Sequence, residues 1–255
     1  MKQIIRFVIC LSMLAVAAAL SACVVGYITG YRDSESVEII PLSGPVVPPV
    51  YFLPPPNLEG MVSVEAALAG RRSQRNFRDK AISTEQLSQI LWAAYGITLP
   101  NPHPQLRGGF RTTPSAGALF PLEIYVVVGN VEGLAPGVYR YISSEHKLVK
   151  VIDGDVRNEL MAAALRQTMV GTAPATIVYT AVFDRMTGRY GERGIRYTYI
   201  ELGHSAQNVY LQAEALGLGT VAVGAFTDDR VIQILELPED EVPLYLMPIG
   251  YFYGN

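Results

Sequence analysis

The sequence predicts an α+β domain built around one central sheet. Three observations support this class: half of the 255 residues are apolar, only 17% are charged, and helix and strand patterns alternate from Met61 onward without an internal repeat. The apolar content is sufficient for a core, which excludes a disordered chain. The net charge of −3 argues against a dedicated nucleic-acid binder, because such a protein needs a basic surface.

The N-terminus has the pattern of a secretory signal followed by a lipid-attachment site. Lys2 and Arg6 precede an apolar run over residues 7–20, and small residues then lead to Cys23. This order is typical of a signal peptide rather than of a stable membrane span. Residues 20–23 (Leu-Ser-Ala-Cys) resemble the bacterial lipobox, which implies cleavage before Cys23 and a diacylglycerol on its thiol. The alternative is an uncleaved membrane anchor with an incidental cysteine.

This interpretation assigns the first 60 residues to export and attachment. We expect a signal peptide over residues 1–22 and a protein exported to a bacterial membrane, on its periplasmic or outer surface, with acyl chains on Cys23 as the anchor. Cys10 is then lost with the signal and Cys23 is lipidated, which excludes a cysteine nucleophile. Residues 23–60 hold seven prolines and are expected to form an extended tether. Alternatively, part of this segment docks on the domain as a strap, through Val50, Tyr51, Phe52 and Leu53.

The domain expected over residues 61–255 begins with two helices and continues with strands. Ser63 is the expected N-cap of a helix that Gly70 ends. Ser83 opens a capping-box pattern with Gln86, which predicts the second helix. β-branched residues predict a strand over 123–128 and a hairpin over 137–141 and 147–152.

In the rest of the domain, helices and strands alternate. We expect helices over residues 155–168 and 194–216, and a further helix that starts at Thr227 and extends to Leu237. Apolar runs predict strands over 174–183, 220–225 and 244–251. Pro248 should confine the last strand to a sheet edge or a bulge.

Residues 71–75 (Arg-Arg-Ser-Gln-Arg) concentrate positive charge in an otherwise acidic chain. The cluster follows a helix rather than opening one. An anion here would therefore be held by guanidinium groups and the Ser73 hydroxyl, not by a helix N-terminus. The alternative is a solvated basic turn.

Two other segments are rich in small residues. Between Pro114 and Pro121, small residues predict a rigid loop whose backbone a flat ligand could approach, or else a structural loop before a strand. Ser115 does not lie in a G-x-S-x-G elbow, so it is not expected to be a hydrolase nucleophile. Residues 217–226 contain three glycines, but their spacing is wrong for a dinucleotide fingerprint. A helix stop followed by a buried strand would also explain them.

Polar residues before and on the long helix form two further groups. Residues 185–197 alternate glycines with charged and phenolic groups. This pattern predicts a mobile loop over a site, in which Tyr190 or Tyr197 would be a proton donor. The alternative is a polar surface loop. A Glu-x-x-His motif follows, but a di-iron site needs a second such motif, so no metal site is expected. The motif and two polar residues after it share one helix face, which should instead anchor the buried side of the helix or touch a ligand; the four are Glu201, His204, Gln207 and Asn208.

Taken in order, these motifs resemble the nitroreductase superfamily. The segments are residues 71–75, Pro-Ser-Ala-Gly-Ala-Leu-Phe-Pro-Leu-Glu-Ile-Tyr from Pro114, Tyr-Gly-Glu-Arg-Gly-Ile-Arg-Tyr from Tyr190, and Gly-Leu-Gly-Thr-Val-Ala-Val-Gly-Ala-Phe from Gly217. Within it, residues 61–251 are most similar to the SagB/ThcOx-type dehydrogenases, whose best-known members oxidise thiazolines and oxazolines in peptides. The resemblance implies an α+β sandwich with a mostly antiparallel sheet flanked by helices, and a homodimer with FMN at its interface.

The resemblance also implies which residues contact FMN. The flavin would transfer a hydride, with NAD(P)H as the candidate electron donor and a small molecule or a peptide as the substrate. Three segments match its binding residues, the second of them reaching the flavin from the other subunit: Arg71, Arg72, Ser73 and Arg75; Pro114, Ser115, Ala116 and Ala118; and Val223, Gly224 and Ala225.

Two departures from the family pattern bear on catalysis. Ala118 stands where many nitroreductases have asparagine, which removes a polar flavin contact. Arg189 and Tyr190 match a Lys-Tyr pair linked to azoline oxidation, but arginine keeps its proton and cannot act as a base. Tyr190 is therefore the better acid/base candidate of this catalytic pair. The alternatives are a catalytically impaired flavin- or ligand-binding lipoprotein, and a nitro- or quinone reductase supplied by another electron donor.

Overall fold

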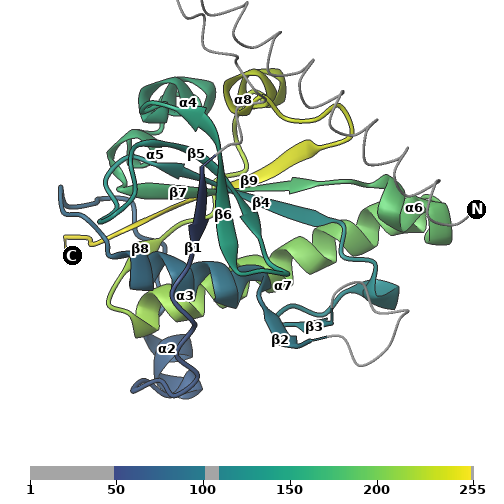
Figure 1. Cartoon of the computed structure of the whole chain (residues 1–255), viewed down its shortest axis with the longest axis horizontal. Helices are drawn as coiled ribbons and strands as arrows, with labels where there is room; N and C mark the ends of the chain where they lie inside the picture. The colour runs from purple at the N-terminus through teal and green to yellow at the C-terminus, as the bar shows by residue number, and fades with distance from the viewer. Residues whose placement is uncertain (1–48, 101–108, 254–255) are drawn as a thin grey trace, which may run out of the picture. The chain divides into compact units, whose positions relative to one another are not determined.

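A computed structural model describes residues 49–100 and 109–253, which form one compact unit around a seven-stranded sheet (Figure 1). The strand order is β1-β6-β5-β4-β7-β9-β8, and every pairing is antiparallel. This confirms the predicted α+β class with a mostly antiparallel sheet. The strands are β1 (Val50–Phe52), β4 (Leu122–Val128), β5 (Gly137–Ile142), β6 (Lys147–Asp153), β7 (Ala175–Ala181), β8 (Gly219–Thr220) and β9 (Val242–Gly250), and a separate pair is formed by β2 (Ile97–Leu99) and β3 (Phe110–Arg111).

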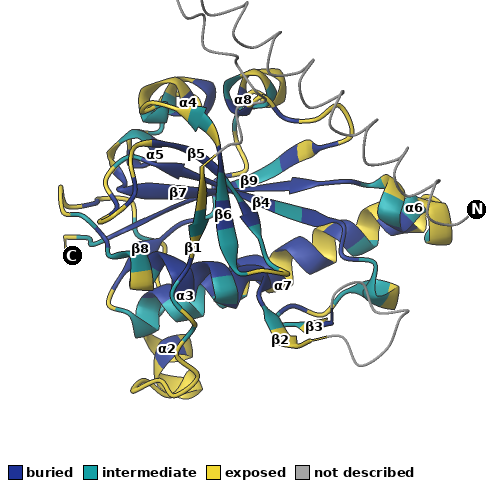
Figure 2. Cartoon of the chain, viewed as in Figure 1, coloured by how far each residue is buried: buried dark blue, intermediate teal, exposed yellow. Residues whose placement is uncertain are grey.

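Helices cover both faces of the sheet, as Figure 1 shows. One layer contains α3 (Thr84–Tyr95) and α7 (Arg193–Ala215), and the other contains α4 (Arg157–Ala163), α5 (Thr168–Thr172) and α8 (Asp228–Leu235). Alternate residues of β4 enter the two cores: Ile124 packs on the α3 and α7 side, and Val127 on the α4 and α8 side. Every residue of β7 is buried as a result (Figure 2), which explains its mostly apolar sequence, with threonine as its only hydroxyl-bearing aliphatic residue type.

The two N-terminal helices form as their caps predict. α2 (Val64–Gly70) begins after Ser63, whose side chain accepts a hydrogen bond from the Ala66 N–H. α3 has the complete capping box: the Ser83 hydroxyl accepts from the Gln86 N–H, and the Gln86 side chain accepts from the Ser83 N–H.

Three predicted elements are wrong in extent or type. The helix expected over 155–168 is broken into α4 and α5, because Leu165 and Arg166 both have positive φ, which ends a right-handed helix. The strand expected over 220–225 pairs as a ladder only at Gly219–Thr220: the Ala222 N–H donates to the Tyr210 hydroxyl, and Val223 then forms a single bridge with Leu246 of β9. The loop expected over 185–197 is helical: α6 (Asp184–Tyr190) and the start of α7 meet at Gly191, which has a φ of 54°.

The end of the proline-rich segment is part of the domain. β1 is the edge strand of the sheet and pairs with β6, with Val50 opposite Val149, and Leu53 is buried in the core. The Asn57 N–H donates to the side chain of Gln89 on α3 at 2.7 Å. The strap alternative therefore holds for these residues, and the domain begins before the predicted boundary at residue 61. The predicted signal, the lipidation site at Cys23 and most of the tether lie outside the described residues.

Pro248 lies where the sheet tolerates a missing N–H. It pairs with Thr176 of β7 on one side, while on the other side the ladder with β8 ends at Ile249. The predicted edge or bulge position is therefore wrong, because β9 lies between β7 and β8 and has no register shift at Pro248; the proline is tolerated because no residue of β8 pairs with it. Within the described ranges, no helix is both long and apolar enough to cross a membrane.

Candidate functional site

The arginine cluster at residues 71–75 lies beside the C-terminal end of α7 and the short strand β8. The Arg71 guanidinium is 5.2 Å from the centroid of the Tyr210 ring, and the Ser73 hydroxyl is 3.1 Å from the Tyr210 hydroxyl. The Gln74 N–H donates to the Thr220 carbonyl at 2.9 Å, which attaches the cluster to β8. The structure therefore brings the first and third predicted binding segments together.

Tyr210 connects these two segments. Its hydroxyl oxygen accepts a hydrogen bond from the Ala222 N–H at 2.8 Å, in addition to its contact with Ser73. This bond takes the place of a strand partner and leaves the following residues, Gly224 and Ala225, exposed, while Val223 is buried. Sequence reasoning missed Tyr210, although its position near the polar end of a long helix was available as a signal.

The cationic groups of the cluster are accessible. Arg72 and Arg75 are exposed and Arg71 is half-buried, and within the described ranges none of the three forms a salt bridge. Arg72 Nη1 donates to the carbonyls of Ala69 and Arg71 at the C-terminal end of α2. This end of the molecule thus presents unneutralised guanidinium groups next to an exposed glycine-containing segment.

The second predicted segment, residues 114–118, lies elsewhere and is strained. Gly117, Ala118 and Phe120 have φ values of 63°, 53° and 48°, a left-handed conformation that costs a non-glycine residue about 1 kcal/mol or more. The Ser115 hydroxyl accepts a hydrogen bond from the Phe120 N–H at 2.9 Å and so holds the loop in this shape.

The predicted catalytic pair lies against this loop. A Cβ atom at Gly117 would be only 2.6 Å from the Tyr190 hydroxyl and 3.1 Å from Arg189 Nη1. The rings of Tyr190 and Tyr197 meet edge to face, with 5.2 Å between their centroids. In one chain the predicted residues therefore form two groups: residues 114–118 with Arg189 and Tyr190, and residues 71–75 with 223–225.

A buried carboxyl lies beneath the 114–118 loop. Glu201 of α7 is only 2% exposed, and its Oε1 accepts a hydrogen bond from the Tyr95 hydroxyl at 2.5 Å. Burial raises the pKa of Glu201 to about 7, against hydrogen bonds from Ser115 and Tyr95 and the charge of Arg111, which lower it. Glu201 thus anchors a buried helix face, as the sequence predicted, whereas His204 and Gln207 are exposed.

The other polar residues of α7 do not form a metal centre. Asn208 is half-buried and donates to the Thr112 carbonyl at 3.1 Å and to the Thr113 hydroxyl at 3.2 Å, which ties α7 to the segment before the strained loop. In the part of the chain that the structure describes, no three histidine, cysteine or acidic side chains are grouped closely enough to hold a metal ion.

Comparison with known proteins places this fold in one family. The Nitroreductase family matches residues 68–251. A nitroreductase-family protein of Methanocaldococcus jannaschii is 46% identical over 195 residues, which cover 76% of this chain and 93% of that protein. A crystal structure of a nitroreductase-family protein from Ralstonia eutropha has a TM-score of 0.67 and 30% identity, and covers 81% of this chain and 90% of that one.

Two more distant relatives have named activities. The microcin B17-processing protein McbC of Escherichia coli is 28% identical over 188 residues, which are 71% of this chain and 65% of McbC. The NADPH-flavin oxidoreductase of Vibrio harveyi is 31% identical over 112 residues, which are 41% of this chain and 47% of that enzyme. These matches and the antiparallel sandwich agree: the chain belongs to the nitroreductase family, and its class is that of the oxidoreductases.

Proposed function

We propose that this protein is an FMN-dependent oxidoreductase of the SagB-type branch, exported and anchored to a membrane by lipid. The observation that carries the proposal is the set of unneutralised guanidinium groups at residues 71–75, held by Tyr210 next to the exposed Gly224 and Ala225. A phosphorylated planar ring needs an anion clamp and a segment that lets the ring approach the backbone. The similarity to McbC favours this branch.

The residues present fit FMN. Arg71, Arg72 and Arg75 supply cationic donors for a phosphate, and the Ser73 hydroxyl adds a further donor. Gly224 is exposed, and a Cβ there would come within 3.3 Å of the Tyr245 ring, so the segment leaves little room for a side chain. Val223, Gly224 and Ala225 would then lie beside the ring, as the family pattern implies.

The site we propose needs two subunits. The 114–118 loop and the arginine cluster are associated with opposite halves of α7: Glu201 lies under the loop and Tyr210 holds the cluster, nine residues or about 14 Å of helix apart. On the N-terminal side of Glu201, α7 exposes Ile195, Tyr199 and Ile200, which are 41%, 52% and 48% exposed. A two-fold dimer through this face would bring the loop of one subunit, with Pro114, Ser115, Ala116 and Ala118, to the cluster of the other.

When bound, the flavin supplies two-electron chemistry by accepting or donating a hydride at N5. The role we assign to Tyr190 is to give or take a proton through its hydroxyl, which lies against Gly117. Arg189 stays protonated and holds a negatively polarised substrate atom or the phenol in place. Because this chain has arginine where azoline oxidases have lysine, we propose a small molecule or a peptide as substrate without assigning azoline oxidation.

The first experiment uses the purified full chain. We expect visible flavin absorbance, release of FMN on heating, and anaerobic bleaching by NADH or NADPH. Replacing Arg71 with Met should lower the FMN content, whereas Arg230→Met on the exposed face of α8 should not. A colourless protein that takes up no added FMN would contradict the proposal.

A second candidate function is a flavin- or ligand-binding lipoprotein with impaired catalysis. Arg189 favours it, because a guanidinium cannot replace a lysine as a base. FMN that binds but is reduced by no donor would support this candidate, and turnover of a quinone, nitroaromatic or azoline substrate would exclude it.

The lipid anchor has its own test. We expect the full chain to incorporate radiolabelled palmitate and to fractionate with membranes, and Cys23→Ser to abolish both. Fractionation of the Cys23→Ser protein with membranes would instead support an uncleaved anchor.

A further inference from the structure

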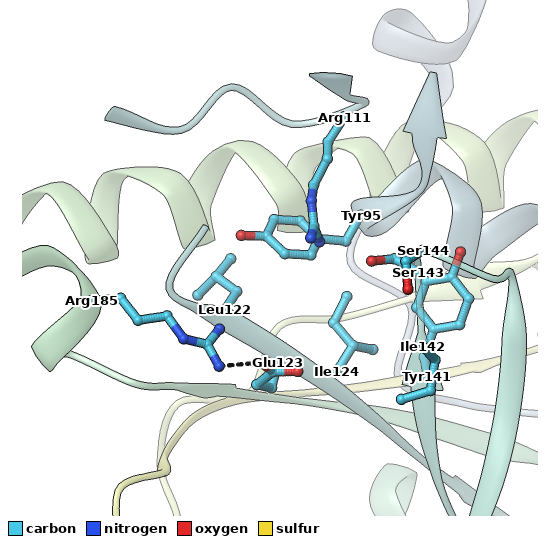
Figure 3. A pocket seen from close by; sticks show the side chains of 10 residues that line it. All are labelled: Tyr95, Arg111, Leu122, Glu123, Ile124, Tyr141, Ile142, Ser143, Ser144 and Arg185. Atoms are coloured by element: carbon cyan, nitrogen blue, oxygen red, sulfur yellow. Dashed lines mark ion pairs between the residues drawn. The ribbon is translucent and has the colours of Figure 1, made fainter. Parts of the chain in front are cut away.

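A cavity of about 380 Å³ lies between the N-terminal end of β4, the turn that joins β5 to β6, and Arg111 of β3 (Figure 3). Pockets of about 300–1,000 Å³ are the usual size for small-molecule ligands. The cavity is separate from the arginine cluster at residues 71–75. Its lining consists of Tyr95, Arg111, Leu122, Glu123, Ile124, Tyr141, Ile142, Ser143, Ser144 and Arg185.

The arginines of this cavity differ in their partners. Arg185 reaches in from α6, where its Nη2 is 2.6 Å from Glu123 Oε1, and its Nη1 donates to the Phe120 carbonyl at 3.0 Å. Glu123 is also 3.1 Å from Arg140. Arg111, by contrast, forms no salt bridge with any described residue. Since Glu123 and Arg185 neutralise each other, the lining has an excess of one positive charge.

Arg111 is held in a fixed position. Its guanidinium carbon is 4.3 Å from the centroid of the Tyr95 ring and 4.5 Å from that of Phe120. Burial lowers the pKa of the guanidinium, and its Nε is buried without a hydrogen-bond partner among the described residues. Glu123 and Glu201 act on its charge from a distance, but neither forms a salt bridge with it, so an anion bound here would stabilise a guanidinium that is partly removed from water.

The rest of the lining defines what else the ligand contains. Leu122, Ile124 and Ile142 offer an apolar wall, and Figure 3 shows Ser143 and Ser144 facing it from the β5–β6 turn. The Tyr141 hydroxyl is 2.8 Å from His146 Nδ1 and is therefore already partnered. A phosphate would use the cation but not the apolar wall. A carboxylate with a short apolar body would use both, together with the serine hydroxyls.

We propose that this cavity binds a small monocarboxylate, with Arg111 holding the carboxylate and the apolar wall of β4 and β5 holding the body of the ligand. The guanidinium lies against the Tyr95 and Phe120 rings, which are at 83° to each other, so its position is restricted and little rotamer freedom is lost when a planar carboxylate binds. The site does not depend on the flavin or on the arginine cluster.

The test uses benzoate as the probe, titrated calorimetrically into the purified full chain. We expect saturable binding of benzoate, and binding of benzyl alcohol that is at least about tenfold weaker because it lacks the charge. Arg111→Met keeps an unbranched side chain over Tyr95 and should weaken benzoate binding at least about tenfold. Arg230→Met removes a positive charge from the far layer and should leave the affinity unchanged.

Two further measurements keep the proposal testable if Arg111→Met does not fold. In the unmodified chain, benzoate should slow the reaction of Arg111 with phenylglyoxal, followed by peptide mass spectrometry, and should not slow that of Arg230. Saturating FMN should not displace benzoate. Equal affinity in both variants, no protection of Arg111, or displacement by FMN would each overturn the proposal, the last by placing benzoate in the proposed flavin site.

Discussion

Glu201 makes the stability of the protein depend on pH in an unusual direction. Burial raises its pKa in the folded chain to about 7, above the ordinary value of 4.5 that applies when the chain is unfolded. The folded state therefore binds this proton more tightly, so the stabilising contribution is complete below pH 4.5 and is lost as the pH rises through 7. Each pKa unit is worth about 1.4 kcal/mol, which gives a total effect of about 3 kcal/mol.

Glu201→Gln removes this titration while keeping an oxygen that accepts from Tyr95. Relative to the unchanged protein, the free energy of unfolding of Glu201→Gln should rise by about 3 kcal/mol between pH 4.5 and pH 8. Urea unfolding at a series of pH values measures this difference. Glu192→Gln, at an exposed position before the same helix, is the control and should show no such trend. A flat difference for Glu201→Gln would mean that the carboxyl titrates normally.

Tyr210 holds two segments through one oxygen atom. In Tyr210→Phe, the Ala222 N–H and the Ser73 hydroxyl lose their partner, and we expect a loss of about 1–3 kcal/mol of stability. FMN content should fall as well, because Ser73 and residues 223–225 would no longer be held together. Tyr253→Phe is the matched control, since that ring is exposed and its hydroxyl has no hydrogen-bond partner among the described residues. Urea unfolding and flavin absorbance would show whether the two variants differ; equal behaviour would rule out the connecting role.

At the residue scale, the sequence predicts which face of a helix is polar better than it predicts the hydrogen-bond partners of the residues on that face. The helical spacing of Glu201 with His204 and Asn208 identified a polar face, and Glu201 does anchor it. Its partner Tyr95 is 106 residues away, and no local pattern links the two. The same holds for Tyr210 and Ala222, because a hydrogen bond between a phenol and a backbone N–H leaves no periodicity in a sequence.

At the element scale, the strap β1 provides a test of where the domain begins. Leu53 is 8% exposed and packs in the core, whereas its neighbour Phe52 is 74% exposed. Leu53→Ala should therefore destabilise the full chain by about 2–5 kcal/mol, and Phe52→Ala should change stability by less than about 0.5 kcal/mol. Urea unfolding of both variants measures the contrast. Equal, small effects would mean that residues 50–53 contribute little to the domain in solution.

Elements with strong local signals were predicted within one or two residues. The capping box at Ser83, the hairpin of β5 and β6, and the long helix α7 are of this kind. The failures occur where tertiary contacts override local preference. Leu165 and Arg166 are ordinary helix formers, yet they adopt a left-handed conformation between α4 and α5. Likewise, the apolar run after Thr220 has strand character but keeps only one bridge to β9, between Val223 and Leu246.

At the scale of the whole molecule, the predicted site residues separate into two groups on one chain. Residue patterns alone do not place these groups in space; the separation was expected only from the family resemblance, which implies that residues 114–118 reach the flavin of the other subunit. The 114–118 loop lies over the N-terminal half of α7 and the arginine cluster lies beside its C-terminal end. Under the function proposed above, a second subunit supplies the missing group, so the oligomeric state and the flavin content should change together.

The exposed face of α7 is where that second subunit would bind. Ile200→Glu places a charge in the middle of this apolar face, and burying an unpaired carboxylate at an interface is strongly unfavourable. We expect the dimer dissociation constant to rise at least about 100-fold, and FMN content to fall with it. Val151→Glu makes the same kind of change at a residue of β6 that is 42% exposed, and should leave a flavin-loaded dimer.

Light scattering after size exclusion, recorded with flavin absorbance, measures both the oligomeric state and the FMN content. A monomeric Ile200→Glu protein that retains FMN would show that one chain forms the whole site, and an Ile200→Glu protein that stays dimeric would place the interface elsewhere.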